Sequence, residues 1–524
     1  MRPKRLIAVF LAFTVCISLC SCDVSDLLQE PETSGADHTE QRYPISELKN
    51  QVEAYQKSWK ESAETPDLPS QIEAVQSAVD EAYAIHCRAQ IAYYADWHND
   101  DLDALNLQCT EDYYVADEIA SWFFANGYQF SAEPDLFQDY IEEDDLKYYA
   151  SNSLNRVIAH ARSSADSESE RIESYYDLAY DDTADISVTN IRCANIYLDS
   201  LKELDVSDAL YAYYNRDYTA AEASAAFQMI KERFVPLRDA VVNMLLDSAD
   251  ELLQQELAAD PYDLLQKYAA KLSPSIAESA EKLFSEHLFT KAEGVNCYDG
   301  SFTINLPNEQ TGLMYTYLSD SILDLVTVTH EFGHFHSDWR DKTPICLQSM
   351  NLDLAEAQSQ SMVTLFMPYY PEIFKDNAEQ MQLLVLLDLL DSVISGFAVG
   401  EFEYQVTQRL DDISPAETAA LFSSLMKECS VNLEFYEVTH LFEQPGYYIS
   451  YGVSALPALE MYTIVQTDPD KAISVYDHMS RCSCLSGEYG FREVMQSCGF
   501  SDYFTTNEIG RLADSIDSIL QNSK

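Results

Sequence analysis

Apolar residues recur at helical spacing through most of this chain. Near the start of the regular pattern, Ile45, Leu48, Val52, Tyr55 and Trp59 are separated by three or four residues. This is the period of one buried helix face. Similar stretches follow to about residue 290. The pattern therefore predicts a mostly α protein.

Prolines predict where some of these helices begin and end. An apolar-periodic stretch over residues 239–260 stops before Pro261. Another begins at Pro274 and continues through Phe289, with Ser273 placed to cap its first turn. Proline suits the first helical position because the N–H that it lacks would have no partner within the helix.

The pattern changes near Gly294. The segment "SFTINL", residues 301–306, alternates apolar and polar side chains, which predicts a strand. Pro307 follows it directly and favours an edge position, where the missing N–H costs no ladder hydrogen bond. Such an edge could bind a peptide backbone as an added strand.

Helical texture returns after this strand and continues to the C-terminus. One helix is expected from about Ser319 through Trp339, and a second over residues 349–367, ending before Pro368. A chain of 524 residues is too long for one ordinary core. We therefore expect a helical N-terminal lobe over 43–290 and a second domain over 291–515.

The amino-acid composition limits the classes of molecule that this protein could bind. The hydrophobic share of 47% is typical of a globular protein. Asp and Glu number 88 against 32 Lys and Arg, which gives a formal net charge of −56. Such a surface repels nucleic acid and anionic lipid headgroups, so we expect no nucleic-acid partner.

The first 22 residues differ from the rest. A basic start is followed by an apolar run, Leu6 to Leu19, which is short for a membrane span. It ends at "LCSC", which resembles the bacterial lipoprotein signal. The resemblance implies a signal over 1–22, lipid on Cys22, a flexible tether over 23–42 and anchoring at the extracytoplasmic face of a bacterial cell membrane. An ordinary cleaved signal is the alternative.

The clearest chemical motif is His330-Glu331-Phe332-Gly333-His334. Residues four apart lie on one face of a helix, so the two imidazoles can converge on one Zn²⁺. Glu331 lies on the same turn, where its carboxylate can take a proton from water at the metal. His336 points nearly the opposite way, so we interpret it as a core residue, a residue that supports the ligands from behind or a substrate-facing residue, rather than as a ligand. Gly333 predicts a close approach by another backbone or by substrate.

A catalytic zinc needs a third protein ligand. The segment "LDLAEAQSQSM" offers Asp353, Glu356 and Ser359. Glu356 follows His334 by 22 residues, enough for a loop and an antiparallel return helix. We expect this carboxylate to be buried, and a metal would compensate its charge.

The segments "HEFGHFHSD", "AEAQSQ" and "HLFEQPGYYISYGVSALPAL" resemble the oligoendopeptidase F and thimet oligopeptidase group of zinc metallopeptidases. The resemblance implies a zincin-like fold, with two helical lobes around a deep channel and a small β-sheet beside the active helix. It also implies one zinc per chain and short peptides as substrates. The implied ligands are His330, His334 and Glu356.

The same resemblance implies the catalytic groups. Glu331 would be the general base, and His440, Tyr448 and Tyr451 would stabilise the oxyanion. Tyr447 is an alternative to Tyr448, because the two are adjacent. Gly446 and Gly452 favour a mobile loop around these tyrosines.

The sequence leaves two other functions open. One is a carboxypeptidase on a similar scaffold, which needs a basic residue for the terminal carboxylate of the substrate. The other is a peptide-binding lipoprotein without catalysis. This chain also departs from the family at Val363, where related enzymes often carry an acidic residue, and at His336, which lies one place earlier than the usual extra histidine.

Overall fold

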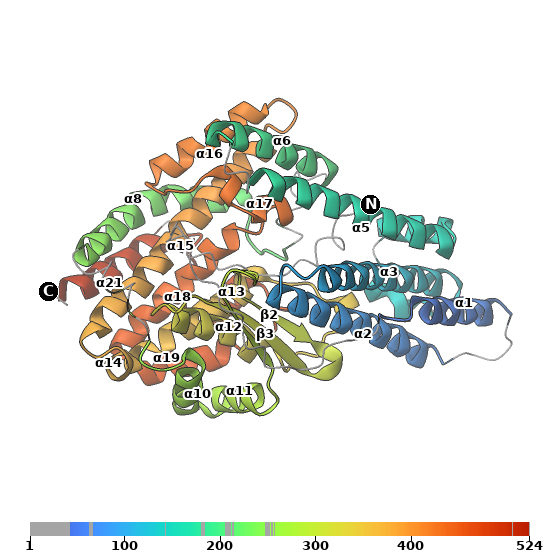
Figure 1. Cartoon of the computed structure of the whole chain (residues 1–524), viewed down its shortest axis with the longest axis horizontal. Coiled ribbons are helices and arrows are strands. Elements are labelled where there is room, and N and C mark those ends of the chain that lie inside the picture. Colours follow the sequence, from blue (N-terminus) through green and yellow to red (C-terminus); the bar gives the residue numbers. More distant parts are fainter. Residues whose placement is uncertain are drawn as a thin grey trace. The chain divides into compact units, whose positions relative to one another are not determined.

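The computed structural model describes residues 42–61, 67–141, 143–179, 184–204, 211, 214–246, 252, 255, 257–505 and 507–522 (Figure 1). This part of the chain is mostly helical and contains one small three-stranded sheet, which confirms the predicted fold class. The predicted signal, the lipidation site Cys22 and the tether up to residue 41 lie outside the described residues.

The chain forms two compact units that are interleaved along the sequence. The first contains the described residues up to Glu168, together with Leu288–Ser319 and Trp339–Gln348. The second contains Ser169–His287, Asp320–Asp338 and the described residues from Ser349 onward. The predicted boundaries, 43–290 and 291–515, and the channel between two lobes stay predictions.

The first unit is built from α1, α2, α3, α4 and three 3-10 helices, together with the sheet. Its helices are α1 (Ile45–Glu61), α2 (Leu68–Ala95), α3 (Asp100–Phe130), η2 (Pro134–Tyr140), α4 (Glu143–Ser151), η3 (Pro307–Glu309) and η4 (Ile345–Leu347). Trp59 of α1 lies against Phe123 of α3 and Phe137 of η2, with ring centroids 5.3 and 5.8 Å apart. The apolar positions that predicted α1 therefore form part of a buried core.

The N-terminal end of this unit is fixed by one ion pair. Arg42, the last residue of the predicted tether, donates from Nε and Nη2 to the two carboxylate oxygens of Asp112, at 2.6 and 2.7 Å. A bidentate pair of this kind defines direction as well as distance. Arg42 therefore belongs to the folded unit.

The sheet has the strand order β1-β3-β2. Its strands are β1 (Phe289–Glu293), β2 (Phe302–Leu306) and β3 (Thr311–Leu318); β1 is parallel and β2 antiparallel to β3. β2 is the strand predicted from alternation, and it lies at an edge of the sheet and ends at Pro307, as expected. Peptide binding at this edge stays a prediction.

The second unit holds most of the remaining helices. They are α6 (Ile186–Leu204), α8 (Ala220–Leu245), α10 (Pro261–Leu272), α11 (Pro274–Ser285), α12 (Asp324–Asp338), α13 (Leu352–Leu365), η5 (Met367–Tyr369), α14 (Tyr370–Ile373), η6 (Lys375–Asn377), α15 (Ala378–Thr407), α16 (Pro415–Glu428), η7 (Phe435–Glu437), α17 (His440–Glu443), α18 (Ile449–Thr467), α19 (Pro469–Met479), α20 (Phe491–Cys498) and α21 (Glu508–Asn522). The helix α5 (Leu154–Ala179) contributes residues to both units.

Most predicted helix ends differ from the structure by a few residues. Ser273 caps α11 as predicted and accepts a hydrogen bond from the N–H of Ile276 at 3.2 Å. The helix that carries the histidines begins at Asp324 rather than near Ser319, because Asp320 has a φ of 56° and a turn precedes the helix. The next helix begins at Leu352, after the N-cap Asn351.

α15 lies within the second unit and packs against α8, α16 and α18 (Figure 1). By length and composition alone, Lys375–Thr407 could cross a membrane, and it is the one such segment among the described residues. However, 72% of its most apolar window is buried by other parts of the chain. A buried core helix has this composition as well.

The predicted mobile loop around Gly446 and Gly452 is wrong in its second half. Gly452 lies inside α18, where a Cβ added to it would stand 2.9 Å from Cδ2 and 3.0 Å from the backbone nitrogen of Phe397 on α15. The glycine is therefore required by helix packing. Gly446 does adopt a left-handed conformation, with a φ of 83°.

Candidate metal centre and active site

α12 places two histidines side by side in a buried position. His330 and His334 are each 5% exposed, and their ring centroids lie 5.0 Å apart. The helix is buried on several sides, with Val328, Phe332 and Phe335 excluded from solvent. The four-residue spacing therefore puts both imidazoles on the same face, as the motif predicts.

α13 brings the third candidate ligand to this pair. Oε2 of Glu356 lies 3.5 Å from Nε2 of His330 and 3.7 Å from Nε2 of His334. The three ligand atoms all lie within 4.8 Å of one another. Among the described residues, one group of at least three His, Cys, Asp or Glu side chains is close enough to hold a metal ion. It consists of His330, His334 and Glu356.

The close approach of the two helices depends on Gly333. A Cβ at this position would stand 2.6 Å from Cα of Ser359 on α13, closer than real Cβ contacts allow. The prediction that another backbone approaches Gly333 is confirmed. Any larger residue would push α13, and with it Glu356, away from the histidines.

The protonation states of the two histidines and of Glu356 favour binding of a cation between them. Burial lowers the pKa of His330 well below its usual value, with a further contribution from His334, whose own pKa burial lowers to about 3. Both imidazoles are therefore neutral and keep a lone pair for a metal. Burial raises the pKa of the Glu356 carboxyl to about 7, against the effect of its hydrogen bonds to Tyr447 and Ser359.

The donor set itself fits zinc. Nε2 of His330 is buried and has no hydrogen-bond partner among the described residues. A buried polar atom without a partner is costly, and a metal ion would satisfy it. Two imidazole nitrogens and one carboxylate oxygen are a usual ligand set of catalytic zinc, with a position left for substrate or water.

Glu331 lies on the same turn of α12 and is fully buried. The sequence predicts it as the general base, and its place beside the two histidines fits that role. A carboxylate at this position can accept a proton from a water molecule that enters the pocket.

The sequence left open which of two adjacent tyrosines faces the ligands. Oη of Tyr447 donates to Oε1 of Glu356 at 2.9 Å, and Tyr447 is fully buried. Burial, together with the Glu356 and Tyr451 side chains, raises the pKa of this phenol well above its usual value, so it remains a donor. Tyr447 therefore orients the third candidate ligand, a role that residue types alone did not assign.

The other predicted catalytic groups gather beside Tyr447. Nε2 of His440 lies 3.2 Å from Oη of Tyr451, and burial lowers the pKa of His440 to about 4. The imidazole stacks on the Tyr447 ring, with centroids 4.9 Å apart. The ring of Tyr448 lies 5.8 Å from that of His440 and is partly accessible. The structure therefore brings all four rings together.

His336 is a core residue, which is one of the roles that the sequence left open. Its Nδ1 lies 2.8 Å from Oγ of Ser279 on α11, and its Nε2 lies 3.2 Å from Oγ of Ser480. Its ring stacks on Tyr476 of α19 at 5.8 Å. His336 therefore joins α12 to helices on either side. Val363 is also buried in the core, at 4% exposure.

Solved structures of several peptidases have a similar architecture. A protein assigned as oligoendopeptidase F from Bacillus anthracis str. Ames is 16% identical, with 93% of this chain and 98% of that chain covered and a TM-score of 0.71. PZ peptidase A with an inhibitor is 15% identical, covering 93% and 99%, with a TM-score of 0.65. The M32 carboxypeptidase from Deinococcus radiodurans R1 is 11% identical, covering 86% and 99%, with a TM-score of 0.58.

The chain has the oligoendopeptidase fold. The likeness extends over nearly the full length of both chains, and at these identities it establishes the fold and not the activity. No protein-family model matches the sequence, and no curated protein matches it either. The function must therefore be argued from the site.

Proposed function

We propose that this protein is a zinc-dependent peptidase that hydrolyses internal bonds of short peptides. The observation that carries the proposal is the convergence of His330, His334 and Glu356, with Glu331 on the same turn as the histidines. The similarity to oligoendopeptidase F structures supports the same reading. A zinc ion held by these three ligands would polarise the scissile carbonyl and increase the acidity of water.

The other side chains of the site would transfer the proton and orient the zinc ligand. Glu331 would accept a proton from the attacking water and later deliver it to the leaving amine. Tyr447 would hold Glu356 by its 2.9 Å hydrogen bond, so that Oε2 keeps facing the histidines. Fixing one carboxylate oxygen in this way limits rotation of the ligand.

His440 and Tyr451 are placed to act as a pair. Because the pKa of His440 is lowered by burial, its imidazole is neutral and one ring nitrogen carries a hydrogen. If Nε2 donates to Oη of Tyr451, 3.2 Å away, the phenolic hydrogen of Tyr451 is directed elsewhere. It can then stabilise the negative charge that develops on the carbonyl oxygen. Tyr448, partly accessible beside this pair, is the second proposed donor.

A carboxypeptidase is the second candidate, because Trypanosoma cruzi metallocarboxypeptidase 1 and the M32 carboxypeptidase from Deinococcus radiodurans R1 have a similar fold, at TM-scores of 0.51 and 0.58. Internally quenched peptides with blocked and with free C-termini separate the two. We expect both peptide types to be cut, with cleavage lost on chelation and in Glu331→Gln. Cleavage of free ends alone would indicate a carboxypeptidase. A folded, zinc-loaded chain that cuts neither would indicate a binding protein.

We further propose that lipid on Cys22 anchors the enzyme at the extracytoplasmic face of a bacterial membrane. The support is the apolar run that ends at "LCSC" in the sequence. Expression in a bacterium with radiolabelled palmitate, followed by membrane fractionation, tests it. Label and membrane association should both be lost in Cys22→Ala and kept in Cys20→Ala. Equal labelling of the two variants would contradict the assignment.

A further inference from the structure

A fully buried ion pair lies one helical turn before the candidate metal ligand. Asp353 precedes Glu356 by three residues on α13, and its side chain has no exposed surface. Its Oδ2 accepts a 2.8 Å hydrogen bond from Oη of Tyr218 and lies 3.5 Å from Nε of Arg216, which is equally buried. The segment that contains Arg216 and Tyr218 therefore fixes the turn that carries Glu356.

The same guanidinium also reaches the tyrosines. Nη2 of Arg216 donates to Oγ of Ser450 at 2.7 Å, and Ser450 lies in the first turn of α18, next to Tyr451. The neighbouring Tyr214 donates from Oη to the carbonyl of Pro445 at 3.0 Å, and its ring meets the Tyr447 ring edge-on. One short segment thus contacts both the ligand helix and the tyrosine segment.

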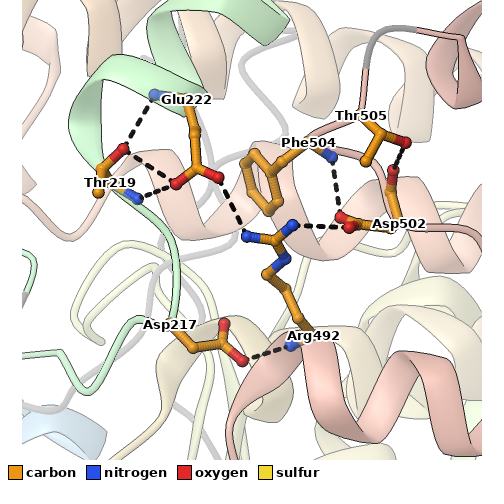
Figure 2. A network of polar contacts seen from close by, with 7 residues as sticks. All are labelled: Asp217, Thr219, Glu222, Arg492, Asp502, Phe504 and Thr505. Carbon is orange, nitrogen blue, oxygen red and sulfur yellow. Dashed lines mark hydrogen bonds and ion pairs between the residues drawn. The ribbon is translucent and has the colours of Figure 1, made fainter.

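The segment is itself held from its other side (Figure 2). The backbone N–H of Arg492 donates to Oδ2 of Asp217 at 2.9 Å, and the Arg492 side chain binds Glu222 and Asp502. Phe504 lies against that guanidinium and stacks on Tyr218 at 4.1 Å. Packing against Phe504 therefore helps to hold the Tyr218 ring, whose hydroxyl donates to Asp353.

We propose that Arg216, Tyr218 and Asp353 are positioning residues for the reaction. Two groups of the site come from different helices: Glu356 from α13 and Tyr451 from α18. A guanidinium is a planar fork with several donors, so it can bind Asp353 with one nitrogen and Ser450 with another. This sets the orientation of the oxyanion donor relative to the metal ligand.

Stability alone does not explain such a pair. Burying two charges costs nearly as much as their attraction returns, and well-packed apolar side chains usually stabilise a core as well or better. What apolar packing lacks is direction, and an active site requires reacting groups held to within a fraction of an ångström. The inference rests on the proposed peptidase function.

Two variants test the contacts of this segment with α13 and with α18, and both keep the charges of Arg216 and Asp353. Tyr218→Phe removes the hydrogen bond to Asp353, and Ser450→Ala removes the link to α18. Tyr503→Phe is the matched control: it is equally buried, and its hydroxyl donates to Oε2 of Glu460 at 2.7 Å, within the same unit. The measurements are zinc affinity by competition with a chromophoric chelator, kcat and KM on a quenched peptide, and thermal unfolding.

We expect Tyr218→Phe to bind zinc about tenfold more weakly, as is common when a group behind a ligand is removed. Ser450→Ala should keep its zinc affinity and KM but lose about tenfold in kcat, because a misplaced donor weakens only the transition state. Arg216→Lys, which keeps the charge but not the fork, should also lose kcat. Tyr503→Phe should change the melting temperature alone.

If either hydroxyl variant behaves like Tyr503→Phe, the positioning role is wrong and the network is only structural. Should Arg216→Lys not fold, the two hydroxyl variants still decide, because they leave the ion pair intact. A wild-type chain that binds zinc but cuts no peptide contradicts the proposed function instead. In that case the Tyr218→Phe zinc affinity still tests the α13 end of the link.

Discussion

The hydroxyl of Tyr447 donates to Oε1 of Glu356 at 2.9 Å and leaves Oε2 facing His330 and His334. The two oxygens of one carboxylate are thereby given different tasks. Oε1 is held by Tyr447, while Oε2, which also accepts a 3.2 Å hydrogen bond from Oγ of Ser359, is placed where it could bind a metal. This arrangement gives the adjacent Tyr447 and Tyr448 different roles.

Tyr447→Phe should weaken zinc binding about tenfold to a hundredfold, because a ligand whose orienting hydrogen bond is lost rotates more freely. Tyr448→Phe should leave zinc affinity unchanged and lower kcat. Competition with a chromophoric chelator gives the affinities, and a quenched peptide gives the rates. Equal zinc affinity in both variants would show that the Tyr447 hydrogen bond does not orient the ligand.

Glu331→Gln should fold, keep its zinc and lose at least about a hundredfold in kcat, the usual contribution of general acid–base catalysis. The amide has the size of the carboxylate but cannot accept the proton. Zinc content by mass spectrometry and peptide hydrolysis are the measurements. Substantial remaining activity would mean that another residue activates the water.

Gly333→Ala should destabilise the protein by about 1–3 kcal/mol, since its Cβ would collide with Cα of Ser359. It should also weaken zinc binding. Gly510→Ala is the control within α21, where only the end of the Arg233 side chain lies near, at 3.2 Å. There alanine should stabilise the helix by up to about 1 kcal/mol. Urea unfolding measures both, and the same sign for both variants would contradict the argument.

Zinc removal should lower the melting temperature. A ligand at a hundred times its dissociation constant stabilises the folded state by about 2.7 kcal/mol. Thermal unfolding with zinc and with chelator should therefore differ for the wild type, and should coincide for His334→Ala. A wild-type transition that does not respond to zinc would argue against a folded-state metal site.

The stability of the first unit should depend on Asp80 and on pH. Asp80 of α2 is buried, accepts from the N–H of Ile345 at 2.8 Å, and has its pKa raised by burial to about 6 from 3.8. Between pH 3.8 and about 6 the folded form keeps a proton that the unfolded form has lost, so stability falls as the pH rises through this range.

Asp80→Asn removes this penalty while retaining an acceptor for Ile345. The variant should be more stable than the wild type at pH 8, by up to about 3 kcal/mol, and the difference should disappear as the pH falls below 3.8. Asp135→Asn, at an exposed position, is the control and should change little. Chemical unfolding at several pH values measures this. A constant difference across the range would exclude the ionisation as its cause.

The sequence by itself determined the features that depend on neighbouring positions. The four-residue spacing of His330 and His334 fixes a shared helix face, because helix geometry has a fixed period. Three other features were also predicted from neighbouring residues. They are the cap of α11 at Ser273, the strand β2 from its alternating residues, and the close approach at Gly333, which only glycine permits.

Tertiary structure decided what depends on contacts between distant segments. The Tyr447 hydroxyl reaches Glu356 across 91 positions, and Asp353 meets Tyr218 across 135, so no local period could show either contact. Tyr447 and Tyr448 are chemically identical in the sequence, and only the packing of α13 against α18 distinguishes them. Gly452, expected in a loop, lies in α18, where the close packing of Gly396 and Phe397 of α15 leaves no room for a Cβ. Residue types thus specified the chemistry available to the site, and long-range packing assigned the chemistry to particular atoms.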